Sequence, residues 1–199
     1  MPDPIGKVSD SGYARRLLAA QPELAAEIAA PAQFSRAEMA AALAGAEHDD
    51  EPALMRRLRR LRQRVLLRLV ARDLGGLADL DEVCRSMSDL AELAIDVALD
   101  DKELIVVGMG KLGGRELNVS SDIDLVFVHP GGTHEQERYE RAGRRLIRVL
   151  ANVTEDGFVF RVDMRLRPYG DSGPLDCSFD FLENYFVAQG REWERYAWI

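Results

Sequence analysis

The segment "SDIDLVFVHP", residues 121–130, places two acids inside an apolar run that is typical of a buried β-strand. Side chains alternate between the two faces of a strand, so Asp122 and Asp124 share one face, and the apolar residues between and after them form the other. The apolar face has to pack against a core. The two carboxylates, whose backbones are about 6.7 Å apart, therefore lie together on the opposite face.

Two carboxylates at this spacing repel each other, and one of them takes up a proton unless a cation neutralises the pair. Hard oxygen ligands favour Mg²⁺, and Mn²⁺ is the alternative. The pair alone is also compatible with a solvated strand face. A third acid is therefore needed before the pattern predicts a metal site.

That third acid is Asp163, in the alternating segment "FVFRVDMRLR", residues 158–167, which predicts another strand. Asp163 shares its predicted face with Arg161, Arg165 and Arg167, which suits phosphate oxygens but also describes a surface ladder of ion pairs. If the two strands are neighbours, the three acids form a two-metal site of the kind used for in-line phosphoryl displacement.

A glycine-rich segment, "GKLGGREL", residues 110–117, follows the apolar strand segment "ELIVVGMG". Gly113 and Gly114 allow the backbone to approach a phosphate closely and offer N–H donors, although Gly-Gly after a strand is also a common turn. A Walker A motif is absent. Residues 108–113 match G-x-G-x-x-G, but no long helix fits between Gly113 and Asp122, so the Rossmann interpretation fails.

Helical periodicity dominates the first hundred residues, and strands begin only after them, which predicts an α+β protein. Pro22 predicts a break between two short helices, and Ser35 with Glu38 predicts a capping box. We expect a helical N-terminal region at 1–100, a catalytic core at 101–176, and the start of a following helical segment at 177–199. The longer predicted helices span about residues 51–74, 80–99, 134–153 and 179–199.

Composition limits the classes of function. The 199 residues are 47% hydrophobic and 30% charged, with a net charge of -8. An acidic chain is a poor nucleic-acid binder, so we expect the arginine-rich helix at 54–72 to face solvent or a partner rather than DNA. Cys84 and Cys177 are far apart and predict no disulfide framework. With no signal segment and no long apolar run, we expect a cytoplasmic protein without membrane contact.

The segments "GMGKLGGRELNVSSDIDLVF" and "RVDMRLRPYGDSGPL" resemble the DNA polymerase β-type nucleotidyltransferase superfamily. More closely, they are similar to the bifunctional glutamine synthetase adenylyltransferase/adenylyl-removing enzymes, over roughly residues 50–199. The resemblance implies a polymerase β-type fold, with a small mixed sheet and flanking helices, preceded by a helical region. Asn118 and the segment "SSDIDL" resemble the N-terminal, adenylyl-removing domain of that family more than its second domain.

The resemblance implies that inorganic phosphate attacks an adenylylated tyrosine of glutamine synthetase and releases ADP, which regulates nitrogen assimilation. It implies Mg²⁺ (or Mn²⁺) as cofactor, nucleotide and phosphate as ligands, and the PII signalling protein as a partner of the full-length enzyme. The alternatives are an ATP-dependent adenylyltransferase and a non-catalytic regulatory fragment. The residues implied for catalysis and metal binding are Asp122, Asp124 and Asp163, and those for nucleotide or phosphate binding are Gly113, Gly114, Ser121, Arg165 and Arg167.

Overall fold

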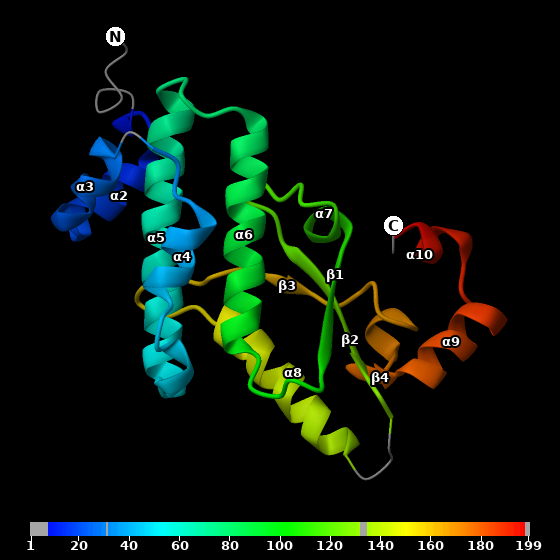
Figure 1. The fold of residues 1–199 in the computed structure, drawn as a ribbon. Coiled ribbons are helices and arrows are strands. Elements are labelled where there is room, and N and C mark those ends of the chain that lie inside the picture. The colour runs from blue at the N-terminus through cyan, green and yellow to red at the C-terminus, as the bar shows by residue number, and fades with distance from the viewer. Residues whose placement is uncertain (1–7, 31, 132–134, 198–199) are drawn as a thin grey trace.

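The structure is a computed structural model that describes residues 8–30, 32–131 and 135–197. It places a group of helices beside a small β-sheet (Figure 1). Two long helices, α5 and α6, lie next to each other, and three short helices pack around them. In chain order these helices are α2 (Gly12–Ala20), α3 (Ala25–Ala29), α4 (Arg36–Ala42), α5 (Glu51–Leu74) and α6 (Leu80–Ala98).

The helix boundaries follow the local signals in the sequence. Pro22 begins a 3₁₀ turn, Pro22–Leu24, between α2 and α3, so the predicted break is confirmed. The capping box of Ser35 and Glu38 opens α4. Asp50 caps α5 by accepting a hydrogen bond from the Ala53 N–H at 2.8 Å. The predicted long helix therefore begins and ends close to its expected residues.

The sheet has four strands, β1 (Ile105–Met109), β2 (Ile123–His129), β3 (Val162–Asp163) and β4 (Asp176–Ser178). β2 is its centre: β1 pairs antiparallel along one edge, whereas β3 and β4 pair parallel with opposite ends of the other edge. Helix α8 (Gln136–Ala151) connects β2 to β3, and the short helix α7 (Gly110–Gly113) follows β1. A small mixed sheet with flanking helices is what the sequence predicts.

The predicted length of the third strand, residues 158–167, is wrong, because only Val162 and Asp163 form β3. Upstream, the N–H groups of Val159 and Phe160 both donate to the Leu150 carbonyl of α8 instead of to a strand. Downstream, the Arg165 N–H donates to the Asp163 carboxylate at 2.8 Å, which turns the chain away from β2. Local hydrogen bonds therefore replace the ladder that the alternation of residues 158–167 predicts.

One hydrophobic core joins the helices to the sheet. It includes Leu58 of α5, Leu90 of α6, Phe127 of β2 and Leu146 of α8, all fully buried. The predicted region 1–100 thus shares its core with the predicted catalytic region. At the other end, the expected boundary at residue 176 falls within β4, which leads directly into α9 (Phe179–Ala188) and then α10 (Glu192–Tyr196).

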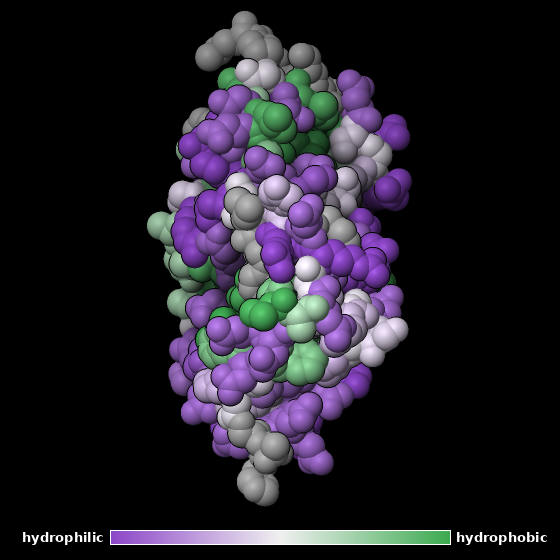
Figure 2. Space-filling model, turned by 90° about the vertical axis from the view of Figure 1, so that its right-hand side faces the viewer, coloured by the Kyte–Doolittle hydropathy of each residue, from purple (hydrophilic) through white to green (hydrophobic). Residues whose placement is uncertain are grey.

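Figure 2 shows apolar areas at the top and in the lower centre of the face that it draws. The exposed apolar side chains of the structure include Leu77 and Leu80 near the turn between α5 and α6, and Phe179 and Val187 of α9. Val187 is 78% exposed. Among the described residues, no helix combines the length and the hydrophobicity that crossing a membrane requires.

Candidate functional site

Three carboxylates lie near one another at the amino-terminal end of β2. Asp124 is the register partner of Asp163 in the parallel pairing of β2 with β3, and Asp122 precedes Asp124 by two residues. Paired strands are about 4.8 Å apart, so Asp124 and Asp163 are close neighbours on one face of the sheet. The structure thus places side by side the acids that the sequence assigns to two separate strands.

The three acids differ in their electrostatic surroundings. Burial raises the pKa of Asp124, and the nearby carboxylates of Asp163 and Asp122 raise it further. Arg165 holds the pKa of Asp163 below its usual range by hydrogen bonds to the ionised carboxylate. Asp124 is therefore the acid at which negative charge is least well compensated by the protein itself.

Two arginines bind the outer acids. Arg161 Nε lies 2.5 Å from Asp122 Oδ1, and Arg161 Nη2 also donates to the Ser120 carbonyl at 2.8 Å. Arg165 lies across Asp163, with Nε at 2.8 Å and Nη2 at 2.5 Å from Oδ2. Asp124 has no hydrogen-bond or ion-pair partner of this kind among the residues that the structure describes.

The geometry of Arg167 differs from the predicted strand face. Its side chain is only 12% exposed, and it donates from Nη1 to the Met164 carbonyl at 2.7 Å and from Nε to the Pro174 carbonyl at 3.1 Å. β3 ends before Arg167, so strand parity no longer applies to it. The guanidinium closes the loop between β3 and β4.

The glycines bring α7 close to β1 and to the acids. A Cβ on Gly113 would lie 2.8 Å from the Gly108 carbonyl oxygen, so this glycine is required by packing. The Gly114 N–H donates within the turn to the Gly110 carbonyl at 2.9 Å. Gly110 itself has a left-handed φ of 53°, and a Cβ there would lie 3.3 Å from Asp124 Oδ2.

Gly110 was therefore missed by reasoning from the sequence, which singled out Gly113 and Gly114. The pairing of Met109 with Asp124 in the β1–β2 register puts Gly110 beside the central acid. A prediction of the antiparallel pairing could have found it. Arg161 was likewise treated only as a member of a cationic face, although it contacts Asp122 directly.

The loop before β2 is held by its own polar side chains. Ser121 Oγ accepts a hydrogen bond from the Asn118 N–H at 3.1 Å, and Asn118 Oδ1 accepts from the Ser120 N–H at 2.9 Å. Asn118 and Ser121 therefore fix the turn that delivers Asp122 to the site. Binding of nucleotide by Ser121 stays a prediction.

The donor set has the chemistry of a divalent cation site, because three hard carboxylates share one face and crowd Asp124. As they stand, however, the side chains do not converge: among the described residues, no three His, Cys, Asp or Glu side chains are arranged to hold a metal ion. In this arrangement the carboxylates of Asp122 and Asp163 are bound by Arg161 and Arg165.

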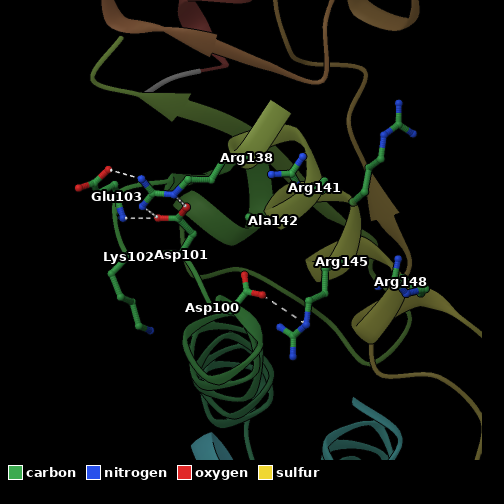
Figure 3. A pocket seen from close by; sticks show the side chains of 10 residues that line it. Asp100, Asp101, Lys102, Glu103, Arg138, Arg141, Ala142, Arg145 and Arg148 are labelled. Atoms are coloured by element: carbon green, nitrogen blue, oxygen red, sulfur yellow. Dashed lines mark hydrogen bonds and ion pairs between the residues drawn. The ribbon is translucent and has the colours of Figure 1, made fainter. Parts of the chain in front are cut away.

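A large groove lies elsewhere, between α8 and the loop after α6 (Figure 3). Its volume is about 920 Å³, and several of its arginines are already bound to acids of this chain. Arg138 contacts Asp101 at 2.5 Å, and Arg148 contacts Glu51 at 2.7 Å. These pairs connect α8 to the helical region, so the groove is lined by ion pairs that hold elements together.

Several arginines of α5 form ion pairs within the fold. Arg68 binds Glu27 and Glu38, and Arg72 binds Glu82 at 2.6 Å. Arg68 and Arg72 therefore connect α5 to its neighbouring helices.

Comparison with known proteins places this geometry in context. A family model described as glutamate-ammonia ligase adenylyltransferase matches residues 8–102 and 100–199. Proteins named bifunctional glutamine synthetase adenylyltransferase/adenylyl-removing enzyme are similar over most of the chain. One from Aromatoleum aromaticum is 48% identical, over 96% of this chain and 23% of its own length.

Two further curated relatives carry the same name. The one from Ralstonia nicotianae is 53% identical over 76% of this chain and 19% of its own length. The one from Chromobacterium violaceum is 49% identical over 95% of this chain and 24% of its own length. The chain therefore spans about a quarter or less of the relatives that it matches.

Proposed function

The chain belongs to the glutamate-ammonia ligase adenylyltransferase family, and on this premise we propose that it removes AMP from an adenylylated tyrosine of glutamine synthetase by phosphorolysis. The proposal includes a polymerase β-type nucleotidyltransferase fold and a Mg²⁺-dependent site, with Mn²⁺ as a substitute. The curated relatives are named for both adenylyl transfer and adenylyl removal. In a longer protein, this activity would serve the regulation of nitrogen assimilation, with the PII signalling protein as a partner.

The observation that supports this proposal best is the register of the sheet, which sets Asp163 beside Asp124, the acid two residues after Asp122. A divalent cation bound by these three carboxylates would neutralise phosphoryl oxygens and stabilise a departing phenolate. The protein's own task is then to hold the reacting groups and to compensate charge, because phosphoryl transfer needs little covalent chemistry from side chains.

In the proposed reaction, an oxygen of inorganic phosphate forms a bond to the α-phosphorus of the tyrosine-linked AMP. The bond between that phosphorus and the tyrosine oxygen breaks, ADP leaves, and the phenolate takes a proton from water. Arg165 is the proposed phosphate contact, because its guanidinium is 73% exposed beside Asp163. Ser121 and the Gly113–Gly114 turn are the proposed neighbours of the nucleotide, whereas Arg167 is assigned to the loop that it closes.

The test is to incubate the protein with adenylylated glutamine synthetase and Mg²⁺, with and without inorganic phosphate, and to separate the nucleotides by chromatography. We expect ADP that depends on phosphate, and unmodified tyrosine on the substrate. The Asp122→Asn, Asp124→Asn double variant should release no ADP. Equal ADP release by the wild type and this variant would contradict the assignment of the acids.

ATP-dependent adenylyl transfer to glutamine synthetase is the second candidate, and the names of the relatives favour it as strongly as removal. The same three carboxylates serve either direction, since both reactions displace an oxygen at the α-phosphorus. With unmodified glutamine synthetase and ATP, transfer would yield pyrophosphate and an adenylylated tyrosine. Pyrophosphate release without any phosphate-dependent ADP would replace removal by transfer.

A further inference from the structure

Guanidinium groups bind the two outer acids of the site, Asp122 and Asp163, whose oxygens a cation would need. Arg161 Nε approaches Asp122 Oδ1 to 2.5 Å. Arg165 contacts both oxygens of Asp163, at 3.1 Å and 2.8 Å from Nε, and adds a hydrogen bond from its backbone N–H. The contact of Arg165 engages both oxygens of Asp163, whereas Arg161 engages one oxygen of Asp122 and the Ser120 carbonyl.

Both arginines form their ion pairs at the surface. The Arg161 side chain is 58% exposed and that of Arg165 is 73% exposed. Exposed ion pairs of this kind contribute little net stability, because the charges are hydrated and the side chains lose entropy. A doubly charged ion between three carboxylates can therefore displace them at small energetic expense.

The central acid is different, because no ion pair occupies it among the described residues. Asp124 lies between its two acidic neighbours and against Gly110, where the absence of a Cβ leaves room for its carboxylate. It is thus the first oxygen donor that an incoming cation can reach without competition. Both oxygens of Asp163 and Oδ1 of Asp122 become available to the cation only when the arginines are displaced.

We propose that Arg161 and Arg165 are positioning residues that compete with the divalent cation for Asp122 and Asp163 and, once displaced, turn to the phosphate oxygens of the substrate. This inference rests on the proposed function and adds a regulation of the same site. Cation binding and anion binding are then coupled: each cation that enters frees two guanidiniums beside it. The site is closed to a lone phosphate and opens to it when the metal is present.

The experiment is calorimetric titration of Mn²⁺ into the 199-residue chain, for the wild type and for Arg161→Gln and Arg165→Gln. Each substitution removes a competitor, so Mn²⁺ should bind about two- to five-fold more tightly than to the wild type. Titration of inorganic phosphate supplies the second measurement. Saturating Mn²⁺ should tighten phosphate binding by the wild type, and each variant should lose most of this gain.

Three controls separate competition from a general change of charge. Arg165→Lys keeps the charge but loses the fork, and should bind Mn²⁺ more tightly than the wild type. Lys111→Gln removes a cation that acts on Asp124 but forms no ion pair with it in the described structure, and should have a smaller effect than either glutamine variant. Arg141→Gln removes a 71% exposed arginine of the α8 groove and should leave Mn²⁺ binding unchanged.

The outcomes distinguish this inference from the function on which it rests. If the wild type binds Mn²⁺ and the two glutamine variants bind it no more tightly, the competition is refuted while the metal site survives. A Lys111→Gln effect as large as theirs would also refute it. If the wild type binds no Mn²⁺ at millimolar concentrations, the proposed metal-dependent function fails together with the inference.

Discussion

Replacing the central acid, Asp124→Asn, should stabilise the protein at neutral pH while removing its capacity to bind a cation. Burial and two neighbouring carboxylates raise the pKa of Asp124 in the folded state. A raised carboxyl pKa contributes stability that is fully present below the unfolded pKa and is lost as pH rises through the folded one. At pH 7 this contribution is lost in the wild type, whereas the neutral asparagine has no charge to repel.

The magnitude follows from the spacing of the strands. Two unit charges about 4.8 Å apart repel by about 1 kcal/mol in water and by about 3–4 kcal/mol at an effective dielectric constant near 20. Asp124 is half-buried, and Arg165 and Lys111 offset part of the repulsion. The net gain in the free energy of unfolding should therefore be about 1 kcal/mol, which raises the Tm of a chain of this size by about 2–4 °C.

Asp163→Asn is the matched control, because its charge is compensated. Arg165 lowers the pKa of Asp163, so its ionised form contributes stability that is present above the unfolded pKa and is lost as pH falls through the folded one. Since Arg165 is largely exposed, losing its ion pair costs about 0.5–1 kcal/mol at pH 7. The repulsion between Asp163 and Asp124 is lost as well, so Asp163→Asn should stabilise the protein less than Asp124→Asn does. The two substitutions have the same chemistry on neighbouring strands, and they differ in that only Asp163→Asn also loses the Arg165 ion pair.

The assay is urea denaturation in the presence of EDTA, followed by circular dichroism, at pH 7 and again near pH 4. The difference between Asp124→Asn and the wild type should shrink at the lower pH, because the raised pKa of Asp124 leaves more of the wild-type carboxyl protonated there. Destabilisation by Asp124→Asn at pH 7, or equal shifts of the same sign for both variants, would refute this account of the site's electrostatics.

Three further predictions concern the same region. Mn²⁺ affinity, measured by calorimetry between pH 4 and pH 8, should begin to fall at a higher pH than an ordinary aspartate would give, because the pKa of Asp124 is raised; a constant affinity down to pH 4 would contradict it. Gly110→Ala should lower the free energy of unfolding, measured by urea denaturation, by about 1 kcal/mol and should weaken Mn²⁺ binding, since Ala strains the left-handed backbone and crowds Asp124. A fully retained Mn²⁺ affinity would show that Gly110 is not needed to make room for the Asp124 carboxylate. Arg59→Leu should lower the free energy of unfolding by about 3 kcal/mol or more, because it leaves buried carbonyls unpaired. A loss below about 1 kcal/mol would show that those carbonyls find other partners.

The part of the fold that could be predicted from sequence is the part that local rules determine. The alternation of Asp122, Ile123 and Asp124 places the acids opposite the core, and Ile123 is fully buried in the structure. Pro22 and the Ser35 capping box gave correct helix boundaries for the same reason. Each signal depends on residues within a few positions of one another.

The strand around Asp163 could not be predicted in the same way, because alternation does not reveal which carbonyl will accept each N–H. The Leu150 carbonyl takes the N–H groups of Val159 and Phe160, and the Asp163 carboxylate takes that of Arg165. Arg167 is then directed into the loop instead of onto the strand face. The alternation is consistent with a strand of ten residues, but only Val162 and Asp163 form one.

So short a strand cannot set its own position, and the position of Asp163 must be determined by what precedes it. Arg59, fully buried on α5, donates to the carbonyls of Val149 at 3.0 Å and of Gly157 at 2.8 Å, and also to that of Asn152. These contacts fix the end of α8 and the turn from which the chain enters β3. The helical region therefore helps to place the third carboxylate, that of Asp163, beside Asp124. A core starting at residue 101 would lack Arg59, whose hydrogen bonds hold the segment before β3.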